Sequence, residues 1–419
     1  MKVLLTLLSV LFSVHVNAQN LTGSNAIFPK GNKASNEFFT GNVWVNVLAP
    51  ADSVFNTQIG SVTFEAGART HWHRHGGGQM LLVTDGTGYY QEKGKLVQII
   101  RKGDVVKCPP DVEHWHGASV ESAMTHLAVN TNTQKKIVTW LNPVTEEAYR
   151  GKKYQAKAPP TQPFGKEAFG SSEGTTLRWL GMAGFLINSR GTTFMIDPLL
   201  GGFDMPVMID FPIAAQNVPR LDAILVTHSD NDHFSVPTCV ALKSVTRAFH
   251  STVYVDSLMK NQGLPTFGHG IGASFDIGKV RVRMTAADHS WQNAYPGTSN
   301  RYFKNEDCTG FWIETPDGNI WATGDSRLMD EHLHMGAPDA ILFDFSDSEW
   351  HFTFEGAVKL ANAYPNTPLL LHHWGSVDAP DFPPFNGDPQ RLLSHVMNPE
   401  RVHILAPGEP FTLKRLKKN

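Results

Sequence analysis

Hydrophobic and polar residues follow two different patterns along the 419-residue chain. Residues 20–130 contain short runs in which apolar and polar positions alternate, and no run with a helical period interrupts them. Residues 61–64 and 96–100 predict strands, and residues 79–90 predict two strands joined by a hairpin turn at 85–88. This pattern favours a small all-β barrel or sandwich.

From residue 174 onwards, predicted strands alternate with predicted helices. A serine cap and an early proline at 235–237 mark a helix start. The short apolar run 224–226 predicts a buried strand. We also expect strands at 177–179, 185–187, 193–196, 253–255, 279–284, 310–315, 319–322, 340–345 and 369–371, and helices at 257–262 and 354–363. Such an alternation predicts an α/β domain with a mixed sheet and helices outside it.

Composition divides the chain at residues 151–173, where proline, glycine and serine clusters are typical of a linker. We therefore predict an N-terminal domain at 19–150 and a C-terminal domain at 174–419. Residues 1–18 predict a secretory signal peptide, because Lys2 precedes an apolar run that is too short to span a membrane; a buried strand is the alternative. The mature protein is expected to be exported, either periplasmic or secreted, without a membrane span.

Overall composition narrows the class of partners. The chain is 41% hydrophobic and 18% charged, which favours packed cores over disorder. A net charge of −3 provides no basic field for nucleic acid. Three widely spaced cysteines give no disulfide framework. We expect a small-molecule substrate, and a homo-oligomer is compatible with this composition.

Candidate metal ligands are concentrated directly after the apolar run 224–226. His228, Asp230, Asp232 and His233 fall within six residues. Imidazole and carboxylate groups together suit Zn²⁺, Fe or Mn²⁺. The adjacent Asp232 and His233 could not easily serve the same ion as His228, so the spacing indicates two metals. Taken alone, the segment also fits a polar loop with a helix-capping aspartate.

Three further candidates each follow a predicted strand at a distance in sequence. His289 follows 279–284, Asp325 follows 319–322, and His373 follows 369–371, with His372 as the alternative to His373. Strands of a packed sheet hold such side chains at one rim. We therefore expect these residues to complete the site begun at His228.

These residues resemble the metallo-β-lactamase superfamily, whose signature is His-x-His-x-Asp-His. Here the signature stands as His228-x-Asp230-x-Asp232-His233, with Asp in place of the second His. The order of the later landmarks is similar to the branch that contains ascorbate-6-phosphate lactonase and N-acyl-phosphatidylethanolamine phospholipase D. The resemblance covers roughly residues 174 to 415 and implies an αββα sandwich.

The resemblance implies a pair of divalent ions, with Zn²⁺ as first choice. Their ligands would be His228, Asp230 and His289 for one ion and Asp232, His233 and His373 for the other, with Asp325 as a bridge. Asp232 would also orient the nucleophile. His351 would donate a proton; the alternative is a histidine near a helix start that has no catalytic role. The extra carboxylate of Asp230 shifts preference toward Mn²⁺ or Fe²⁺, and Asp197 would hold a ligand histidine.

The N-terminal half resembles the cupin family. Its two motifs stand as Gly67-x5-His73-x-His75-x3-Gln79-x6-Gly86 and Gly103-x5-Pro109-x-Asp111-x2-His114, with Gln79 where a Glu is usual. Two residues apart on a strand, His73 and His75 point to the same face. With Gln79 and His114 they would hold one divalent ion (Mn, Fe, Ni or Zn). Alternatively, the histidines bond to each other and to water.

The sequence thus predicts an exported metal-dependent hydrolase, acting on an ester, a lactone or a phosphodiester, with an accessory cupin domain. One alternative places the main activity in the cupin, as a single-metal oxidoreductase or decarboxylase. Another is a non-catalytic ligand-binding protein. An insertion at 291–307 carries Arg301 and Lys304, which fits either a lid over an anionic substrate or a solvated loop.

Overall fold

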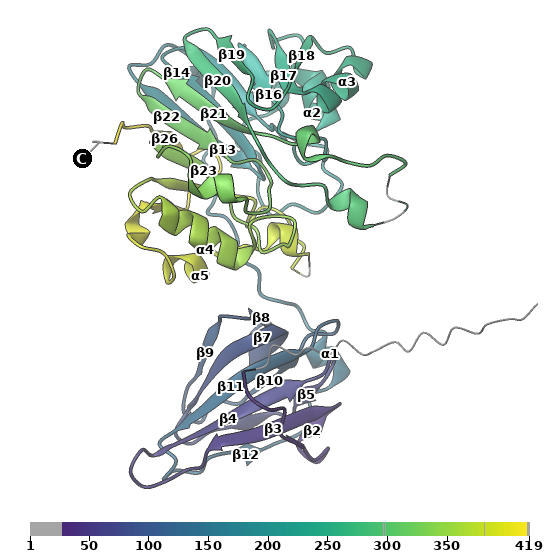
Figure 1. The fold of residues 1–419 in the computed structure, drawn as a ribbon, viewed down its shortest axis with the longest axis vertical. Coiled ribbons are helices and arrows are strands. Elements are labelled where there is room, and N and C mark those ends of the chain that lie inside the picture. The colour runs from purple at the N-terminus through teal and green to yellow at the C-terminus, as the bar shows by residue number, and fades with distance from the viewer. Residues whose placement is uncertain (1–26, 296, 298, 381, 417–419) are drawn as a thin grey trace, which may run out of the picture. The chain divides into compact units, whose positions relative to one another are not determined.

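The computed structural model describes residues 27–295, 297, 299–380 and 382–416. The predicted signal peptide at 1–18 lies outside these residues. Figure 1 shows two compact units, which divide between Tyr154 and Gln155. In the described part of the chain, no helix is both long enough and apolar enough to cross a membrane.

The N-terminal unit is a curved antiparallel sheet that packs around an apolar core. Its main path has the strand order β1-β3-β4-β11-β7-β10-β5-β2. Phe64, Leu81 and Met124 are almost fully buried in its core. The elements are β1 (Asn32–Lys33), β2 (Phe39–Thr40), β3 (Val43–Ala49), β4 (Thr57–Phe64), β5 (Arg69–Thr70), β6 (His73–Arg74), β7 (Gln79–Glu92), β8 (Gln98–Arg101), β9 (Val105–Cys108), β10 (His114–Ala118), β11 (Met124–Thr131), β12 (Thr139–Trp140) and helix α1 (Glu146–Tyr149).

The hairpin predicted at 85–88 is wrong, because β7 runs unbroken from Gln79 to Glu92. Instead of forming a turn, the glycines lie beside a bulge and allow neighbouring backbone atoms to approach closely. On β11, Thr125 pairs with Asp85 and His126 pairs with Val83, which leaves one residue of β7 unpaired. Gly86 has φ +73°, and a side chain there would overlap the carbonyl oxygen of Ala123. The bend lets one strand pair with β11 and β9 in its first half and with β10 and β8 in its second.

The C-terminal unit contains two seven-stranded sheets. The first has the order β18-β17-β16-β15-β14-β13-β26, and the second β19-β20-β21-β22-β23-β24-β25. The first is built from β13 (Thr175–Gly181), β14 (Gly184–Ser189), β15 (Thr192–Ile196), β16 (Ala223–Leu225), β17 (Phe249–Thr252), β18 (Thr266–His269) and β26 (Pro410–Thr412). The second is built from β19 (Ser274–Ile277), β20 (Val280–Thr285), β21 (Gly310–Thr315), β22 (Gly318–Ala322), β23 (Ala340–Asp344), β24 (Leu369–His372) and β25 (Val402–His403).

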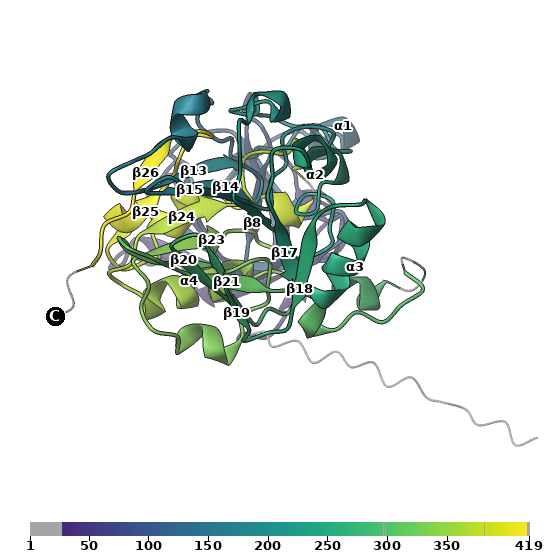
Figure 2. The ribbon, with the colours of Figure 1, turned by 90° about the horizontal axis from the view of Figure 1, so that it is seen from above.

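Successive side chains of a strand point to opposite faces of the sheet, so neighbouring residues of one strand belong to different cores. Phe185 and Ile187 of β14 join the core between the two sheets, whereas the intervening Leu186 packs with α2 (Val236–Leu242) and α3 (Val253–Asn261). Helix α4 (Thr353–Ala363) packs against the second sheet from the outside, as Figure 2 shows. The short helix α5 (Pro389–Leu393) follows near the C-terminus. This arrangement is the expected αββα sandwich.

Two local predictions for this half differ from the structure. Residues 253–255 were expected as a strand, but they form the first turn of α3, because the Thr252 hydroxyl caps the Val255 N–H at 3.3 Å. The segment 151–173 was expected as a linker. From Gln155 onwards it instead packs along the C-terminal unit, where the Ala158 N–H donates to the Gly375 carbonyl at 3.0 Å. Composition alone does not reveal these backbone partners.

Candidate metal centre

The predicted ligands of the C-terminal unit meet at one rim of the sandwich, where several strands end. The loop after β16 supplies His228 to His233, and His289, Asp325 and His373 follow β20, β22 and β24. Gly324 has φ +63°, and a side chain there would be 2.5 Å from the Thr309 carbonyl oxygen, so only glycine allows the turn that presents Asp325.

One group of possible ligands comprises His228, Asp230 and His289, whose candidate ligand atoms all lie within 4.8 Å of one another. The Asp230 Oδ2 atom is 3.3 Å from His228 Nε2 and 3.5 Å from His289 Nε2. Both histidines are almost fully buried. The three residues therefore surround a space of the size that one cation needs.

A second group comprises Asp232, His233 and His373, again with ligand atoms within 4.8 Å of one another. The Nε2 atoms of His233 and His373 are 3.1 Å apart, and His373 Nε2 is 3.2 Å from Asp232 Oδ2. His372 does not belong to this group; its ring packs edge-on against Phe185 with centroids 5.8 Å apart. The structure thus brings His373 to the rim.

Asp325 lies between the two groups. Its Oδ2 atom is 3.0 Å from His233 Nε2 and 3.3 Å from His373 Nε2. The same atom is 3.9 Å from the Nε2 atoms of His228 and His289. One carboxylate is therefore within reach of both possible cation positions.

Hydrogen bonding at the outer edge of the rings fits a metal centre. Carbonyl oxygens only accept, so the contacts of His289 Nδ1 with the Trp350 carbonyl (2.7 Å) and of His373 Nδ1 with the Pro384 carbonyl (2.9 Å) place the proton on Nδ1. In the neutral form of each ring, the Nε2 lone pair then faces the cluster. Among the described residues, His228 Nε2 and Asp325 Oδ1 have no hydrogen-bond partner. Buried donor atoms that converge in this way suit a divalent cation.

The electrostatics of the cluster also require positive charge. Burial alone would lower the pKa of His233, but the carboxylates of Asp325, Asp232 and Asp197 together raise that pKa well above its usual value. For His373, burial is likewise outweighed by Asp325 and Asp232, which raise its pKa to about 9. Protons therefore balance the carboxylates when no cation does, and metal binding would displace them.

Asp197 supports the loop that carries the ligands. Its carboxylate accepts from the Thr227 N–H (2.8 Å), the Thr227 hydroxyl (2.6 Å) and His233 Nδ1 (2.8 Å). The predicted contact between Asp197 and a histidine is therefore present, and it orients the His233 ring.

His351 also reaches the rim, from the turn just before α4. Its Nε2 atom is 3.7 Å from Asp325 Oδ2, and its ring centroid is 5.0 Å from those of His289 and His373. Asp344 at the end of β23 binds His351 Nδ1 at 2.8 Å. Sequence reasoning missed Asp344, although it ends an apolar strand as the strands before the ligands do.

The N-terminal unit contains a second cluster of histidines. The Nδ1 atoms of His73, His75 and His114 face backbone carbonyls of His71, Ile137 and Val112. In the described chain, the Nε2 atoms of His75 and His114 and the Oε1 atom of Gln79 have no hydrogen-bond partner. Burial, the largest effect, lowers the pKa of His114 to about 4, so its ring is neutral and able to ligate.

His116, which is not one of the four predicted cupin ligands, also lies within this cluster. Its candidate ligand atom lies within 4.8 Å of those of His73 and His114. Its Nδ1 atom is 3.1 Å from Nε2 of the fully buried His126. The signal in the sequence was the alternation of His114 and His116 on β10.

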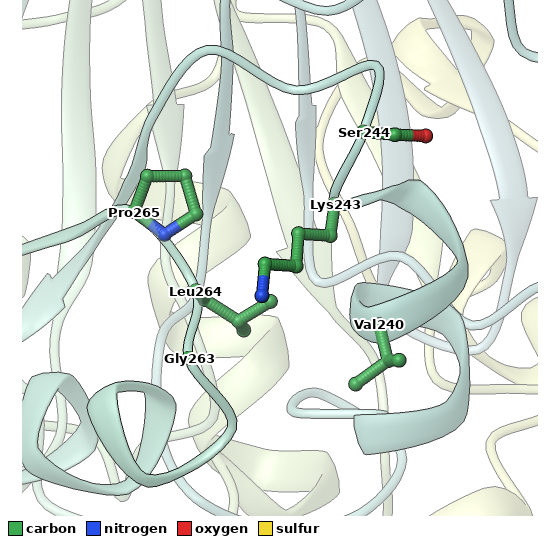
Figure 3. Close-up of a pocket in the computed structure, with 6 residues that line it drawn as sticks. All are labelled: Val240, Lys243, Ser244, Gly263, Leu264 and Pro265. Atoms are coloured by element: carbon green, nitrogen blue, oxygen red, sulfur yellow. The ribbon is translucent and has the colours of Figure 1, made fainter.

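Other predicted features lie apart from the ligands. Within the insertion 291–307, Arg301 pairs with Asp307 at 2.8 Å and lies 3.7 Å from the Tyr254 ring centroid, while Lys304 pairs with Glu306 at 3.2 Å. Both cations are thus engaged inside the insertion. Figure 3 shows an open, mainly apolar pocket on the same unit, which none of the predicted ligands line. It is lined by Val240, Lys243, Ser244, Gly263, Leu264 and Pro265.

Comparison with known proteins matches each unit to a family. Residues 192–374 match the beta-lactamase superfamily domain, and residues 60–130 match the cupin domain. A UPF0173 metal-dependent hydrolase of Caldivirga maquilingensis is 28% identical over 251 residues, which are 57% of this chain and 97% of that protein. An (R)-mandelonitrile lyase of Granulicella tundricola is 46% identical over 118 residues, which are 28% of this chain and 90% of that protein. A cupin-like protein from Thermotoga maritima of known structure is 53% identical and covers 30% of this chain and 96% of its own, with a TM-score of 0.30.

Fold and site together define a two-domain metalloprotein. The chain belongs to the cupin family through its N-terminal domain and to the metallo-β-lactamase superfamily through its C-terminal domain, and it is a metal-dependent hydrolase of that superfamily. The predicted fusion and fold class are confirmed. The assignment to the ascorbate-6-phosphate lactonase branch stays a prediction.

Proposed function

We propose that the C-terminal domain hydrolyses an ester, lactone or phosphodiester bond with two divalent ions, Zn²⁺ as first choice. The observation that supports this proposal most directly is the convergence of imidazole Nε2 atoms on Asp325. The Nε2 atoms of His233 and His373 are only 3.1 Å apart. One ion would be held by His228, Asp230 and His289, and the other by Asp232, His233 and His373. Asp325 would serve both.

Such ions supply Lewis acidity and make water a nucleophile near neutral pH. Around them, the chain's own groups set the geometry. Asp232 lies 3.2 Å from His373 Nε2 and has a second carboxylate oxygen with which to orient water. His351 is held by Asp344 with Nε2 directed toward Asp325, where it can give a proton to a leaving oxygen.

Metal analysis and a substrate panel test this proposal. The purified chain should hold two ions in its C-terminal domain and hydrolyse at least one of an aryl ester, a lactone or a bis-aryl phosphodiester. Asp325→Asn should abolish turnover and lower the metal content. An exposed carboxylate provides the matched control, since Asp204→Asn should change neither. A metal-free or inert wild-type chain would overturn the proposal.

A second candidate function belongs to the cupin domain. The relative named (R)-mandelonitrile lyase is 46% identical over 90% of its length, and the buried histidine cluster offers donor atoms for one cation. We infer that the cupin domain cleaves a cyanohydrin into an aldehyde and hydrogen cyanide. This lyase chemistry takes the place of the oxidoreductase or decarboxylase considered from sequence.

Selective variants separate the two activities. His114→Ala should abolish cyanide release from mandelonitrile, measured by a cyanide assay, and should leave hydrolysis intact. Asp325→Asn should have the reverse effect. Loss of both activities in either variant would contradict two independent sites.

Export is proposed on the sequence of residues 1–18 alone. Expression of the full chain with N-terminal sequencing of the mature protein tests it, with cleavage after Ala18 as the expected result.

A further inference from the structure

Asp230 is the one predicted ligand that departs from the superfamily signature, and it is also held by the insertion 291–307. The Trp291 indole N–H donates to Asp230 Oδ2 at 2.7 Å, and the Gln292 side-chain amide donates to Oδ1 at 3.0 Å. Both donors lie on a short 3₁₀ helix, Trp291–Ala294, that begins two residues after His289. The two carboxylate oxygens of Asp230 are therefore bound from the same side.

This arrangement leaves a lone pair of Asp230 for a cation. A carboxylate oxygen has two acceptor positions, so Oδ2 can accept from Trp291 and still face the imidazoles of His228 and His289 at 3.3 and 3.5 Å. An indole N–H can only donate. Trp291 thus requires an acceptor at position 230, which the carboxylate provides.

The 3₁₀ helix that carries the donors is itself anchored. Asn293 exchanges two hydrogen bonds with the backbone of Phe303, at 2.8 and 2.9 Å. Beyond it, Arg301 pairs with the buried Asp307 at 2.8 Å. Because both ends of the insertion are tied down, Trp291 and Gln292 present their N–H groups in a fixed direction.

We propose that Trp291 and Gln292 are positioning residues that hold Asp230 as a ligand of the first cation site, the one shared with His228 and His289. The donors of both residues contact Asp230, which belongs to the first site and not to the second site formed by Asp232, His233 and His373. The inference rests on the proposed metal centre. It adds that the affinity of one site of the pair is controlled from the insertion.

Cation titration of the full chain tests the proposal. The cupin site is first removed with His114→Ala, and the chelator-treated protein is titrated with Mn²⁺ or Zn²⁺ by calorimetry, with bound metal counted by mass spectrometry. Trp291→Phe keeps an aromatic ring and deletes the N–H donor, and Gln292→Met keeps the length of the side chain. Each should weaken one of the two sites by about 10–100-fold and leave the other unchanged. Tyr302→Phe, an aromatic change on the same insertion, should weaken neither.

The possible outcomes distinguish a failure of the metal centre from a failure of the positioning role. If the parent protein binds no cation in its C-terminal domain, the metal centre itself fails. If it binds two and Trp291→Phe and Gln292→Met bind both as tightly as the parent, the positioning role is overturned. Equal weakening of both sites, or a lowered melting temperature of the metal-free variant, would also overturn it by showing a general structural role. In an Asp230→His background, Trp291→Phe should have no further effect on affinity, because the carboxylate it serves is gone.

Discussion

His351 Nδ1 donates to the buried carboxylate of Asp344 at 2.8 Å, while His351 Nε2 lies 3.7 Å from Asp325 Oδ2. The carboxylate accepts the Nδ1 proton, so the opposite nitrogen is the one presented to the rim. Asp344 stands at the end of β23, and its side chain is inaccessible to solvent. The pair therefore fixes both the orientation of the His351 ring and the nitrogen that faces the proposed reaction.

Replacement of His351 should slow hydrolysis without removing the metals. We expect His351→Gln to lower kcat by about 100-fold or more, which is the usual size of a general-acid contribution. Asp344→Asn should give a smaller loss, because the ring stays but its orientation is no longer enforced. Steady-state kinetics with the responsive substrate and metal analysis measure both effects. The exposed His334→Gln is the control, and unchanged kcat in His351→Gln would exclude the proton-donor role.

Asp197 should matter for metal affinity through His233. Asp197→Asn replaces an acceptor by an amide that can turn a donor toward His233 Nδ1, which disturbs the tautomer that ligation needs. We expect cation affinity at the second site to fall by about 10–100-fold. Cation titration of the metal-free chain checks this, with Asp204→Asn alongside. Wild-type affinity in Asp197→Asn would show that backbone packing alone orients the His233 ring.

Gln79 should limit the affinity of the cupin site. Its Nε2 group donates to Asn130 Oδ1 at 2.9 Å, and within the described chain its Oε1 atom has no partner. Gln79→Glu adds a negative charge next to neutral imidazoles, so divalent cations should bind at least about tenfold more tightly. Titration with Mn²⁺ in an Asp325→Asn background, in which the C-terminal centre should bind metal more weakly, measures this site. Gln98→Glu, on the exposed side of the barrel, should leave affinity unchanged; a similar gain there would point to a general charge effect.

The stability of the C-terminal domain should depend on pH through His250. Burial, followed by the neighbouring His269, lowers the pKa of His250 to about 4. In the unfolded chain this pKa is about 6.5, so between those values the unfolded state binds a proton that the folded state does not. The contribution of the neutral His250 to the free energy of unfolding is therefore complete above pH 6.5 and is lost as pH falls toward 4.

His250→Phe removes this proton uptake, and the neighbouring rings of Phe267 and Phe275 already stack on the site. Between pH 7.5 and 5, wild type should lose about 2 kcal/mol more unfolding free energy than the variant. Urea unfolding at both pH values measures the difference. The exposed His334→Phe should retain the wild-type pH dependence, and an identical pH dependence in His250→Phe would contradict the assignment.

Local signals predicted candidate ligands that the structure brings close together. The change from an apolar strand to His228 and its neighbours is contained in ten residues, and each distant candidate follows a strand whose length is visible in the sequence. Short segments whose residues favour more than one local structure were predicted wrongly. The glycines at 86 and 88 predict a turn, but pairing of β7 with β11 and β10 makes them part of one long strand. Likewise Val253 and Val255 favour a strand, whereas the Thr252 cap and burial of Val255 produce a helix.

The sequence by itself determined the two-domain plan, the family of each domain and the candidate ligands, because strand period, glycine turns and ligand spacing are properties of short segments. Only the tertiary structure decided which histidine the predicted support Asp197 contacts, and that Asp344 and Trp291 support site residues at all. Asp344 on His351, Asp197 on His233 and Trp291 on Asp230 are pairs separated by 7, 36 and 61 residues. No local pattern couples such pairs, since the contact depends on how strands from distant segments align at a common rim and on the direction in which each side chain leaves the backbone.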